Sequence, residues 1–190
     1  MEVGPLSRML VAYLSGHEQV KATVDYVLEK LEVPITALFS TLGRTGARCV
    51  ETVVVAQKLP EMIMELAGNI KKNDTQICSN DMWDPKTWPR EAQGVGWHEA
   101  PRGALSHWIG IKDQKIANYQ CVVPSTWNGS PRDENGKRGP YEEALIGTPV
   151  ANIEEPLEIL RTIHSFDPCM ACAVHVLDAE GKPVTKIKIV

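Results

Sequence analysis

The spacing of apolar residues changes near Lys71, and this change constrains the fold more than any other feature of the chain. Upstream of it, residues 17–32 carry an apolar face at helical spacing, which predicts an amphipathic helix. Residues 72–89 show little periodicity, and residues 94–124 then follow a β-rich pattern. The sequence therefore predicts an α+β fold that is helix-rich in its N-terminal part and contains a β-hairpin in its C-terminal part. The apolar positions of the first helical segment are Val20, Val24, Val27, Leu28 and Leu31.

Further elements are expected on the same grounds. Because a proline bends or breaks a helix, Pro60 is expected to kink or interrupt the third helical stretch. Two β-rich runs flank Lys112–Lys115, and this arrangement predicts a hairpin turn at those residues. In chain order, the expected elements are helices near residues 6–14, 17–32, 44–58, 61–70 and 155–163, strands at 107–111 and 116–123, and a short strand at 184–190.

Composition and charge narrow the class of protein. A length of 190 residues suits one domain, and 43% hydrophobic with 23% charged residues is typical of a globular protein. A run of about 18 apolar residues, which a membrane-spanning helix needs, does not occur, and no signal peptide is expected at the start of this sequence. The net charge of −4 predicts no nucleic-acid partner. Five cysteines, an odd number, argue against a secreted disulfide scaffold.

The residues that carry chemistry lie near the C-terminus. Cys169 and Cys172 are three positions apart, and His175 follows after the same interval. One helical turn or a tight loop aims side chains at this spacing toward one centre. Thiolates select zinc, iron–sulfur clusters, copper or nickel, so a metal site is the leading interpretation, and a redox-active thiol pair is the alternative. A zinc site needs four ligands, and the sequence has no second CxxC or HxxxH motif to supply them.

The other three cysteines are scattered singly along the chain. Cys49, Cys78 and Cys121 have no partner at ligand-like spacing. Free cysteines are among the residues most often buried, so each thiol is expected to be a small buried side chain.

Residues 167–175 read Asp-Pro-Cys-Met-Ala-Cys-Ala-Val-His, which resembles the C-terminal metal-binding signature of the large, catalytic subunits of nickel–iron hydrogenases. Three further stretches agree with that family and stand in its order, at residues 2–6, 99–105 and 123–128. The residues His164-Ser165-Phe166 before the signature are most similar to the respiratory, uptake-type enzymes. The resemblance implies the C-terminal portion of the nickel-dependent hydrogenase large-subunit fold.

The resemblance also assigns metal ligands to this sequence. Cys169 matches the terminal nickel thiolate, and Cys172 matches a thiolate that bridges nickel to an iron carrying carbon monoxide and cyanide. His175 matches a ligand of a magnesium or iron ion near the mature C-terminus, and the backbone carbonyl of Cys121 is expected to contribute to the same ion. The implied cofactors are thus a Ni-Fe centre and a Mg (or Fe) ion.

Four other residues match family positions around the metals. Arg102 matches the arginine over the open edge of the metals, where a planar, permanently charged donor suits a cyanide nitrogen, and Asp167 would orient it. Pro101 would line the cavity around the diatomic ligands, and Ser125 would donate to the other cyanide. Plain structural roles stay open: a surface ion pair for Arg102, a turn hydroxyl for Ser125, and a turn or helix cap for Asp167.

The family pattern divides the chain into residues 1–175 and a C-terminal extension, residues 176–190. In this family, a nickel-dependent endopeptidase removes a short tail directly after the signature histidine. The resemblance therefore implies an unprocessed precursor, cleaved between His175 and Val176, with this endopeptidase and nickel-insertion chaperones as maturation partners. We expect the tail to keep the metal site open for loading.

The family carries a second cysteine pair and a proton-relaying glutamate in its N-terminal half, and neither occurs in this sequence. We therefore expect the chain to be a C-terminal part of a longer subunit, to supply half of the cysteine ligands, and to be inactive alone. The missing N-terminal half is then an expected partner.

The resemblance implies reversible oxidation of dihydrogen to protons and electrons. The electrons would leave through an iron–sulfur small subunit, which carries large subunits of the uptake type across the membrane. That partner implies a membrane-associated or periplasmic location, with the precursor in the cytoplasm. The alternative function is an independent CxxC/His module that binds zinc or iron without catalysis.

Overall fold

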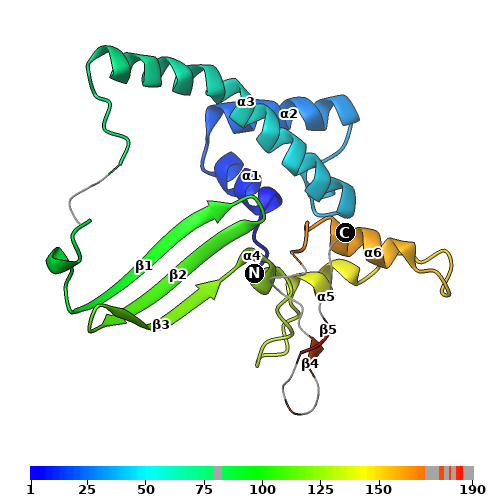
Figure 1. The fold of residues 1–190 in the computed structure, drawn as a ribbon. Helices are drawn as coiled ribbons and strands as arrows, with labels where there is room; N and C mark the ends of the chain where they lie inside the picture. Colours follow the sequence, from blue (N-terminus) through cyan, green and yellow to red (C-terminus); the bar gives the residue numbers. More distant parts are fainter. Residues whose placement is uncertain (79–82, 170–175, 178–179, 181–182, 186–190) are drawn as a thin grey trace.

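In the computed structural model, the N-terminal third of the chain forms three helices that pack around one apolar core (Figure 1). Helix α1 covers Pro5–Leu14, α2 covers Glu18–Leu31 and α3 covers Thr41–Lys71, with a short 3₁₀ turn, η1 (Ile35–Leu38), before α3. The buried core residues are Leu6, Met9, Val20, Val24, Ala47, Val50 and Val54. The expected helix at residues 17–32 is confirmed: Val20 and Val24 of α2 are buried in this core, and Val27 and Leu28 pack against it, whereas Leu31 is exposed.

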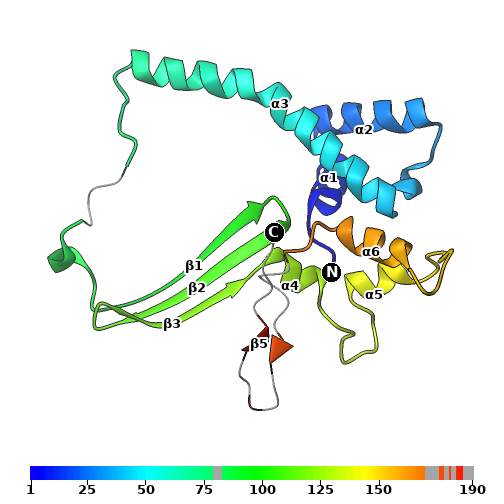
Figure 2. The ribbon, with the colours of Figure 1, turned by 45° about the vertical axis from the view of Figure 1, so that its right-hand side comes forward.

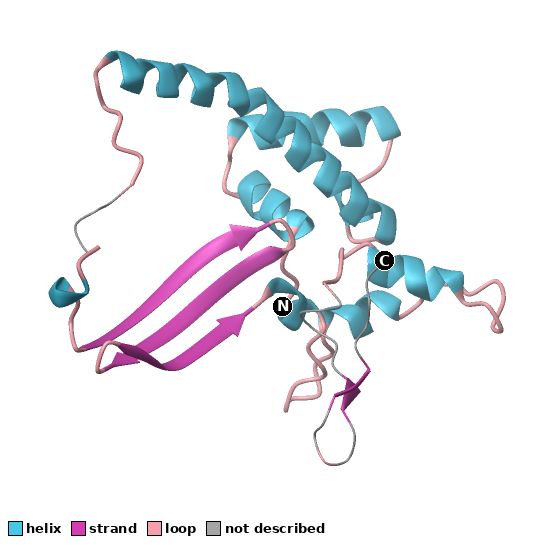
Figure 3. Ribbon diagram, viewed as in Figure 1, coloured by secondary structure: helices cyan, strands magenta, loops and turns pink. Residues whose placement is uncertain are grey.

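The structure describes residues 1–78, 83–169, 176–177, 180 and 183–185. Within these ranges it contains six α-helices, a three-stranded antiparallel sheet and a two-stranded one (Figure 3). The fold is therefore mixed α+β, as the change in periodicity predicted.

Helix α3 runs without a break through Pro60, so of the two expected outcomes, a kink or an interruption, the interruption does not occur. A proline removes the hydrogen bond to the carbonyl four residues earlier, here that of Ala56. Ala56 is exposed, so solvent can satisfy this carbonyl, and the helix continues to Lys71.

The sheet begins after the irregular connection, which contains one short 3₁₀ turn, η2 (Pro85–Thr87). Strands β1 (Glu91–Ala100), β2 (Gly103–Lys112) and β3 (Lys115–Val122) are antiparallel and lie in the order β1-β2-β3. The expected hairpin is confirmed: Asp113 and Gln114 connect β2 to β3 with φ values of 50° and 60°. Two central residues at positive φ suit the twist of a two-residue hairpin.

Three short helices follow the sheet. They are α4 (Pro124–Asn128), α5 (Pro140–Leu145) and α6 (Leu157–His164), and they lie near the end of the sheet where β2 begins (Figure 2). The expected helix at 155–163 is confirmed and starts two residues later, after Pro156. Strand β4 (Val176–Leu177) pairs with β5 (Pro183–Thr185), which covers the start of the expected C-terminal strand; residues 186–190 lie outside the described part of the chain.

Large apolar side chains remain exposed on α3 from Val53 onward, and the far end of this helix extends beyond the other helices (Figure 1). They are Val53, Val55, Leu59, Met62, Ile63, Met64, Leu66 and Ile70. Among the described residues, no helix combines the length and the apolar character needed to cross a bilayer.

Candidate functional site

Segments far apart in the sequence meet at the end of the sheet that faces α1 and α4 (Figure 2). The turn between β1 and β2 carries Pro101 and Arg102, the first turn of α4 carries Ser125, and the segment after α6 carries Asp167 and Cys169. All five are residues that the sequence singled out.

Arg102 and Asp167 form the charged part of this site. The Arg102 Nε donates to the backbone carbonyl of Asp167 at 2.8 Å and lies 3.2 Å from the carboxylate Oδ2, while Nη2 lies 3.4 Å from Oδ1. Asp167 has a φ of 54°, in the left-handed region that Asp tolerates better than most residues. In this conformation both its carbonyl and its carboxylate face Arg102, so Asp167 orients the guanidinium.

Ser125 fixes the backbone of Cys169. The Cys169 N–H donates to the Ser125 Oγ at 3.0 Å, and Ser125 is only 3% exposed. A hydroxyl that accepts one hydrogen bond still holds a hydrogen to donate. The same serine can therefore anchor Cys169 and donate to a ligand beside it.

A cavity of about 140 Å³ unites four of these residues. Its walls combine apolar side chains with one thiol, one hydroxyl and one guanidinium. The lining residues are Ala100, Pro101, Arg102, Leu105, Val123, Pro124, Ser125 and Cys169. Such a wall suits a bound group that the Cys169 sulfur can coordinate and whose negative charge lies next to Arg102.

Of four further expected site residues, two are not described by the structure, and the other two, Cys121 and Val176, do not line this cavity. Cys172 and His175 lie outside the described residues, and Val176 begins β4. Cys121 lies on β3, with its Sγ 3.3 Å from His107 Nδ1. Among the residues that the structure describes, no group of three or more His, Cys, Asp or Glu side chains is placed to hold a metal ion.

The expected burial of the single cysteines is wrong, because Cys49, Cys78 and Cys121 are all exposed. Cys49 lies on the face of α3 opposite the buried Ala47 and Val50. Cys121 belongs to β3, an edge strand with exposed residues along most of its length, and Cys78 lies in the irregular connection.

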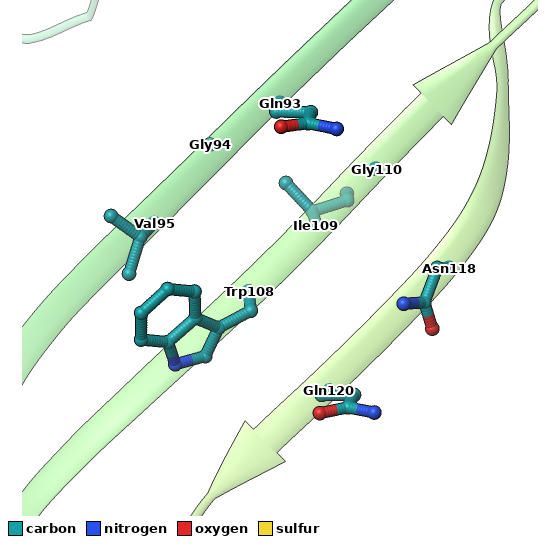
Figure 4. A pocket seen from close by; sticks show the side chains of 8 residues that line it. All are labelled: Gln93, Gly94, Val95, Trp108, Ile109, Gly110, Asn118 and Gln120. Atoms are coloured by element: carbon teal, nitrogen blue, oxygen red, sulfur yellow. The ribbon is translucent and has the colours of Figure 1, made fainter.

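A larger hollow, of about 470 Å³, lies on the sheet and is wide open. Figure 4 shows the indole of Trp108 between Val95 and Gln120, with the carboxamides of Gln93 and Asn118 farther along the sheet on either side of Gly110. It contains none of the residues that the sequence singled out, and it offers neither a thiol nor an imidazole. We therefore place the candidate site at the smaller cavity.

The residues that hold residues 3–4 against the site were not predicted from the sequence. The Asn128 side chain accepts from Val3 N and donates to Val3 O, both at 2.9 Å, and Asn128 is 2% exposed. Gly103, with a φ of 132°, allows this approach: a Cβ there would lie 2.7 Å from Val3 Cγ2 and 2.8 Å from Gly4 N. The only available signal was the position of these residues inside the stretches that match the family.

Arg44 holds the segment that follows α6. Its Nε and Nη2 each donate to a Glu2 carboxylate oxygen at 2.9 Å, and its guanidinium carbon lies 4.0 Å from the centre of the Phe166 ring. A cation over an aromatic face is attracted by the ring quadrupole, more so when both are buried, as here. Glu2, Arg44 and Phe166 therefore connect residue 2 to the residue before Asp167.

Tyr141 completes the packing on the other side of Phe166. The two rings meet edge to face with centroids 4.9 Å apart. The Tyr141 hydroxyl is buried without a hydrogen-bond partner among the described residues. Burial, and secondarily the negative charge of Asp167, raises the pKa of this phenol above its ordinary value.

Comparison with known proteins gives a consistent result. A family model described as nickel-dependent hydrogenase matches residues 1–175. The uptake hydrogenase large subunit of Bradyrhizobium diazoefficiens is 54% identical over 189 residues, which are 100% of this chain and 32% of that protein. The hydrogenase-1 large chain of Escherichia coli is 49% identical over 189 residues, with coverages of 100% and 32%.

Solved structures show the same similarity. The Ni-Fe-Se hydrogenase of D. vulgaris Hildenborough in the reduced state matches with a TM-score of 0.67 and 38% sequence identity, covering 92% of this chain and 35% of that one. The chain thus spans about a third of the length of the curated relatives it matches.

The close approach at Gly103 predicts a large effect of adding one methyl group. Gly103→Ala should lower the free energy of unfolding by about 2 kcal/mol or more, because the added Cβ meets Val3 and Gly4 at a φ that disfavours alanine. Gly96→Ala on the neighbouring strand is the matched control, since its Cβ meets nothing within 4 Å, and should change stability by no more than about 0.5 kcal/mol. Urea unfolding of both variants measures this, and equal losses would contradict the seating of residues 3–4.

The buried phenol of Tyr141 predicts a pH effect. A raised folded-state pKa means that the unfolded chain loses the phenol proton first, so the wild type loses stability as the pH rises from about 10 toward that pKa. Tyr141→Phe should remove this alkaline loss and leave stability near neutral pH unchanged or slightly higher. Tyr26→Phe, at an exposed ring on α2, is the control and should retain the loss. An unchanged alkaline profile in Tyr141→Phe would count against the burial of the hydroxyl.

Proposed function

The chain belongs to the nickel-dependent hydrogenase family, and we propose that its residues form part of the nickel–iron centre of an enzyme that reversibly oxidises dihydrogen to protons and electrons. The observation that carries this proposal is the cavity where the Cys169 thiol, the Arg102 guanidinium and the Ser125 hydroxyl meet. These three groups come from three separate segments, and their convergence gives a ligand site that no single segment supplies.

The donor set fits a nickel–iron centre. Thiolates are soft ligands that suit nickel and iron, and Cys169 with Cys172 would supply two of the four thiolates, or half of the ligand set. When bound, such a centre supplies the redox chemistry that splits dihydrogen. The iron would carry carbon monoxide and cyanide, small ligands that the apolar wall around Pro101 accommodates.

Arg102 and Ser125 act on the charged edge of this site. The guanidinium is permanently charged and held in orientation by Asp167, so it stabilises negative charge in the cavity without reorganising. The Ser125 hydroxyl holds Cys169 through its oxygen and keeps its hydrogen for a cyanide nitrogen. Both residues would therefore orient ligands of the iron.

A second ion belongs to the proposal. We assign His175 and the backbone carbonyl of Cys121 to a magnesium or iron ion near the mature C-terminus. Family membership supports this assignment.

The exposed half of α3 supports a larger assembly. A group of exposed large apolar side chains of this kind is typical of an interface, and the chain spans about a third of the length of its relatives. The proposed partners are the remaining part of the large subunit and an iron–sulfur small subunit, with nickel-insertion chaperones during maturation. The small subunit would give the enzyme a membrane-associated or periplasmic location.

The test uses the large subunit that contains this chain, assembled with its small subunit. Arg102→Lys should retain nickel and iron and lower hydrogen oxidation by about 100-fold or more, because lysine does not reproduce the planar donor held by Asp167. Cys169→Ser should lose nickel. The control is Arg90→Lys, an exposed arginine paired with Asp113 at 2.7 Å at the far end of the sheet, which should leave activity unchanged.

Two results would contradict the proposal. One is full hydrogen oxidation by Arg102→Lys. The other is one zinc ion per wild-type chain in place of nickel, with tetrahedral sulfur–nitrogen coordination, which would favour the independent CxxC/His module.

We also propose that residues 176–190 are removed by an endopeptidase that cuts between His175 and Val176 after metal loading. The start of strand β4 at Val176 supports an ordered element directly after the cleavage position. Incubation of metal-loaded precursor with the matching endopeptidase should remove the mass of the tail, while Cys169→Ser precursor, which lacks nickel, should stay intact. Intact loaded precursor, or equal cleavage of both proteins, would overturn this proposal; mass spectrometry distinguishes these outcomes.

A further inference from the structure

The turn that carries Arg102 is a short connection between two strands. Ala100 pairs with Gly103, so Pro101 and Arg102 alone connect β1 to β2. Gly103 follows them at a φ of 132°, and a turn with proline at its second position followed by a glycine at positive φ is a common way to close a hairpin. Contacts from outside the hairpin add to this local support.

Arg8 on α1 supplies these contacts. Its Nη1 donates to the Ala100 carbonyl at 2.9 Å, and its Nη2 donates to the Pro101 carbonyl at 3.0 Å. Nη1 also donates to the Glu99 carboxylate at 2.9 Å. One guanidinium thus binds three consecutive residues directly before Arg102.

The same guanidinium is anchored on α3. Its Nε and Nη2 donate to the two Glu51 carboxylate oxygens at 2.5 and 2.9 Å. These bonds, with those to residues 99–101, use all five N–H donors of an arginine, and the side chain is only 18% exposed. Arg8 therefore joins α1, α3 and the β1–β2 turn through one planar group.

The guanidinium of Arg8 also remains positively charged in this environment. Burial opposes the charge, but hydrogen bonds and attraction from Glu51 and Glu99 outweigh it, so the pKa of the guanidinium lies above its ordinary value. Hydrogen bonds from a charged donor are shorter and stronger than neutral ones. Lysine has three donors on a single nitrogen and cannot span the same acceptors.

We propose that Arg8 is a positioning residue, which holds the Pro101–Arg102 turn in the shape that presents Arg102 to Asp167 and the cavity. Its effect on hydrogen oxidation rests on the proposed function, whereas its effect on the turn does not. Arg8 does not itself line the cavity; it binds the backbone carbonyls of Ala100 and Pro101 in the cavity wall, so it acts through the turn that carries Arg102.

Hydrogen–deuterium exchange of the assembled large subunit tests, independently of activity, whether Arg8 holds the Pro101–Arg102 turn. Arg8→Lys should speed exchange of the amides in residues 99–106 by about tenfold or more, and leave those in residues 112–118 unchanged. Arg90→Lys, directly before β1 at the far end of the sheet, should leave residues 99–106 unchanged. Unchanged exchange at 99–106, or equal acceleration in both segments, would overturn the proposal.

A double-variant comparison tests whether Arg8 acts through Arg102. Arg8→Lys should lower the turnover of hydrogen oxidation by about tenfold or more with nickel content retained, since small misplacements of a functional group cost rate steeply. In the Arg102→Lys background the same change should lower turnover no further. An equal loss in both backgrounds would mean a general structural role and would overturn the positioning role.

A second variant keeps the test decisive if Arg8→Lys does not assemble. Glu51→Gln removes the charged anchor and leaves Arg8 in place, so it should produce the same pattern at 99–106 with smaller size. If the exchange at residues 99–106 in Glu51→Gln equals that of the wild type, the proposal is overturned. If the wild type oxidises no hydrogen, the proposed function fails, and the exchange measurement still decides whether Arg8 holds the turn.

Discussion

The side-chain amide of Asn128 pairs with both backbone polar groups of Val3, and the rest of the site depends on this pairing. It seats residues 3–4 against Gly103, where only a glycine leaves room. Helix α1 then starts at Pro5, and its first helical hydrogen bond runs from the Arg8 N–H to the Gly4 carbonyl. Arg8 thereby lies in the first turn of a helix whose start is fixed beside the hairpin that Arg8 holds.

The site is stabilised differently from the core. The helices pack through apolar side chains, for which area matters and direction does not. The site is held by polar side chains that bind backbone atoms: Arg8 to Ala100 and Pro101, Ser125 to Cys169, and Arg48 to Ser165. Hydrogen bonds specify direction as well as distance, so they fix the orientation of Arg102 and Cys169 in a way that packing alone does not.

Much of the fold was predictable from local patterns. The apolar spacing in residues 17–32 and the turn at Lys112–Lys115 are local signals, and both were confirmed. The passage of α3 through Pro60 was not predictable, because it depends on the exposure of the Ala56 carbonyl. The burial of Cys49 was predicted wrongly, because the packing partners of α3 decide which face of that helix is buried.

Cys169 was predictable from its spacing to Cys172 and His175, whereas the other residues of the site were predictable only through the resemblance. Pro101, Arg102, Ser125, Asp167 and Cys169 matched family stretches, and the structure brings these five together. Arg8 and Asn128 were missed because their partners lie 92 and 125 positions away, and no local periodicity records such a pairing. A buried arginine with all its donors used looks, in the sequence, like any charged residue on an amphipathic helix.

The separation of the paired residues along the chain also orders the assembly of the site. Contacts between distant residues close large loops, and such contacts form late because the chain entropy is lost before they stabilise anything. The α1–α2–α3 core involves residues 6–54, whereas Asp167 and Cys169 meet their partners across 65 and 44 residues. The β1–β2 hairpin and α4 precede the 167–169 segment along the chain, so the wall of the cavity is synthesised before the thiol that enters it. Residues 167–169 thus reach the site only after the chain that forms its wall has been synthesised.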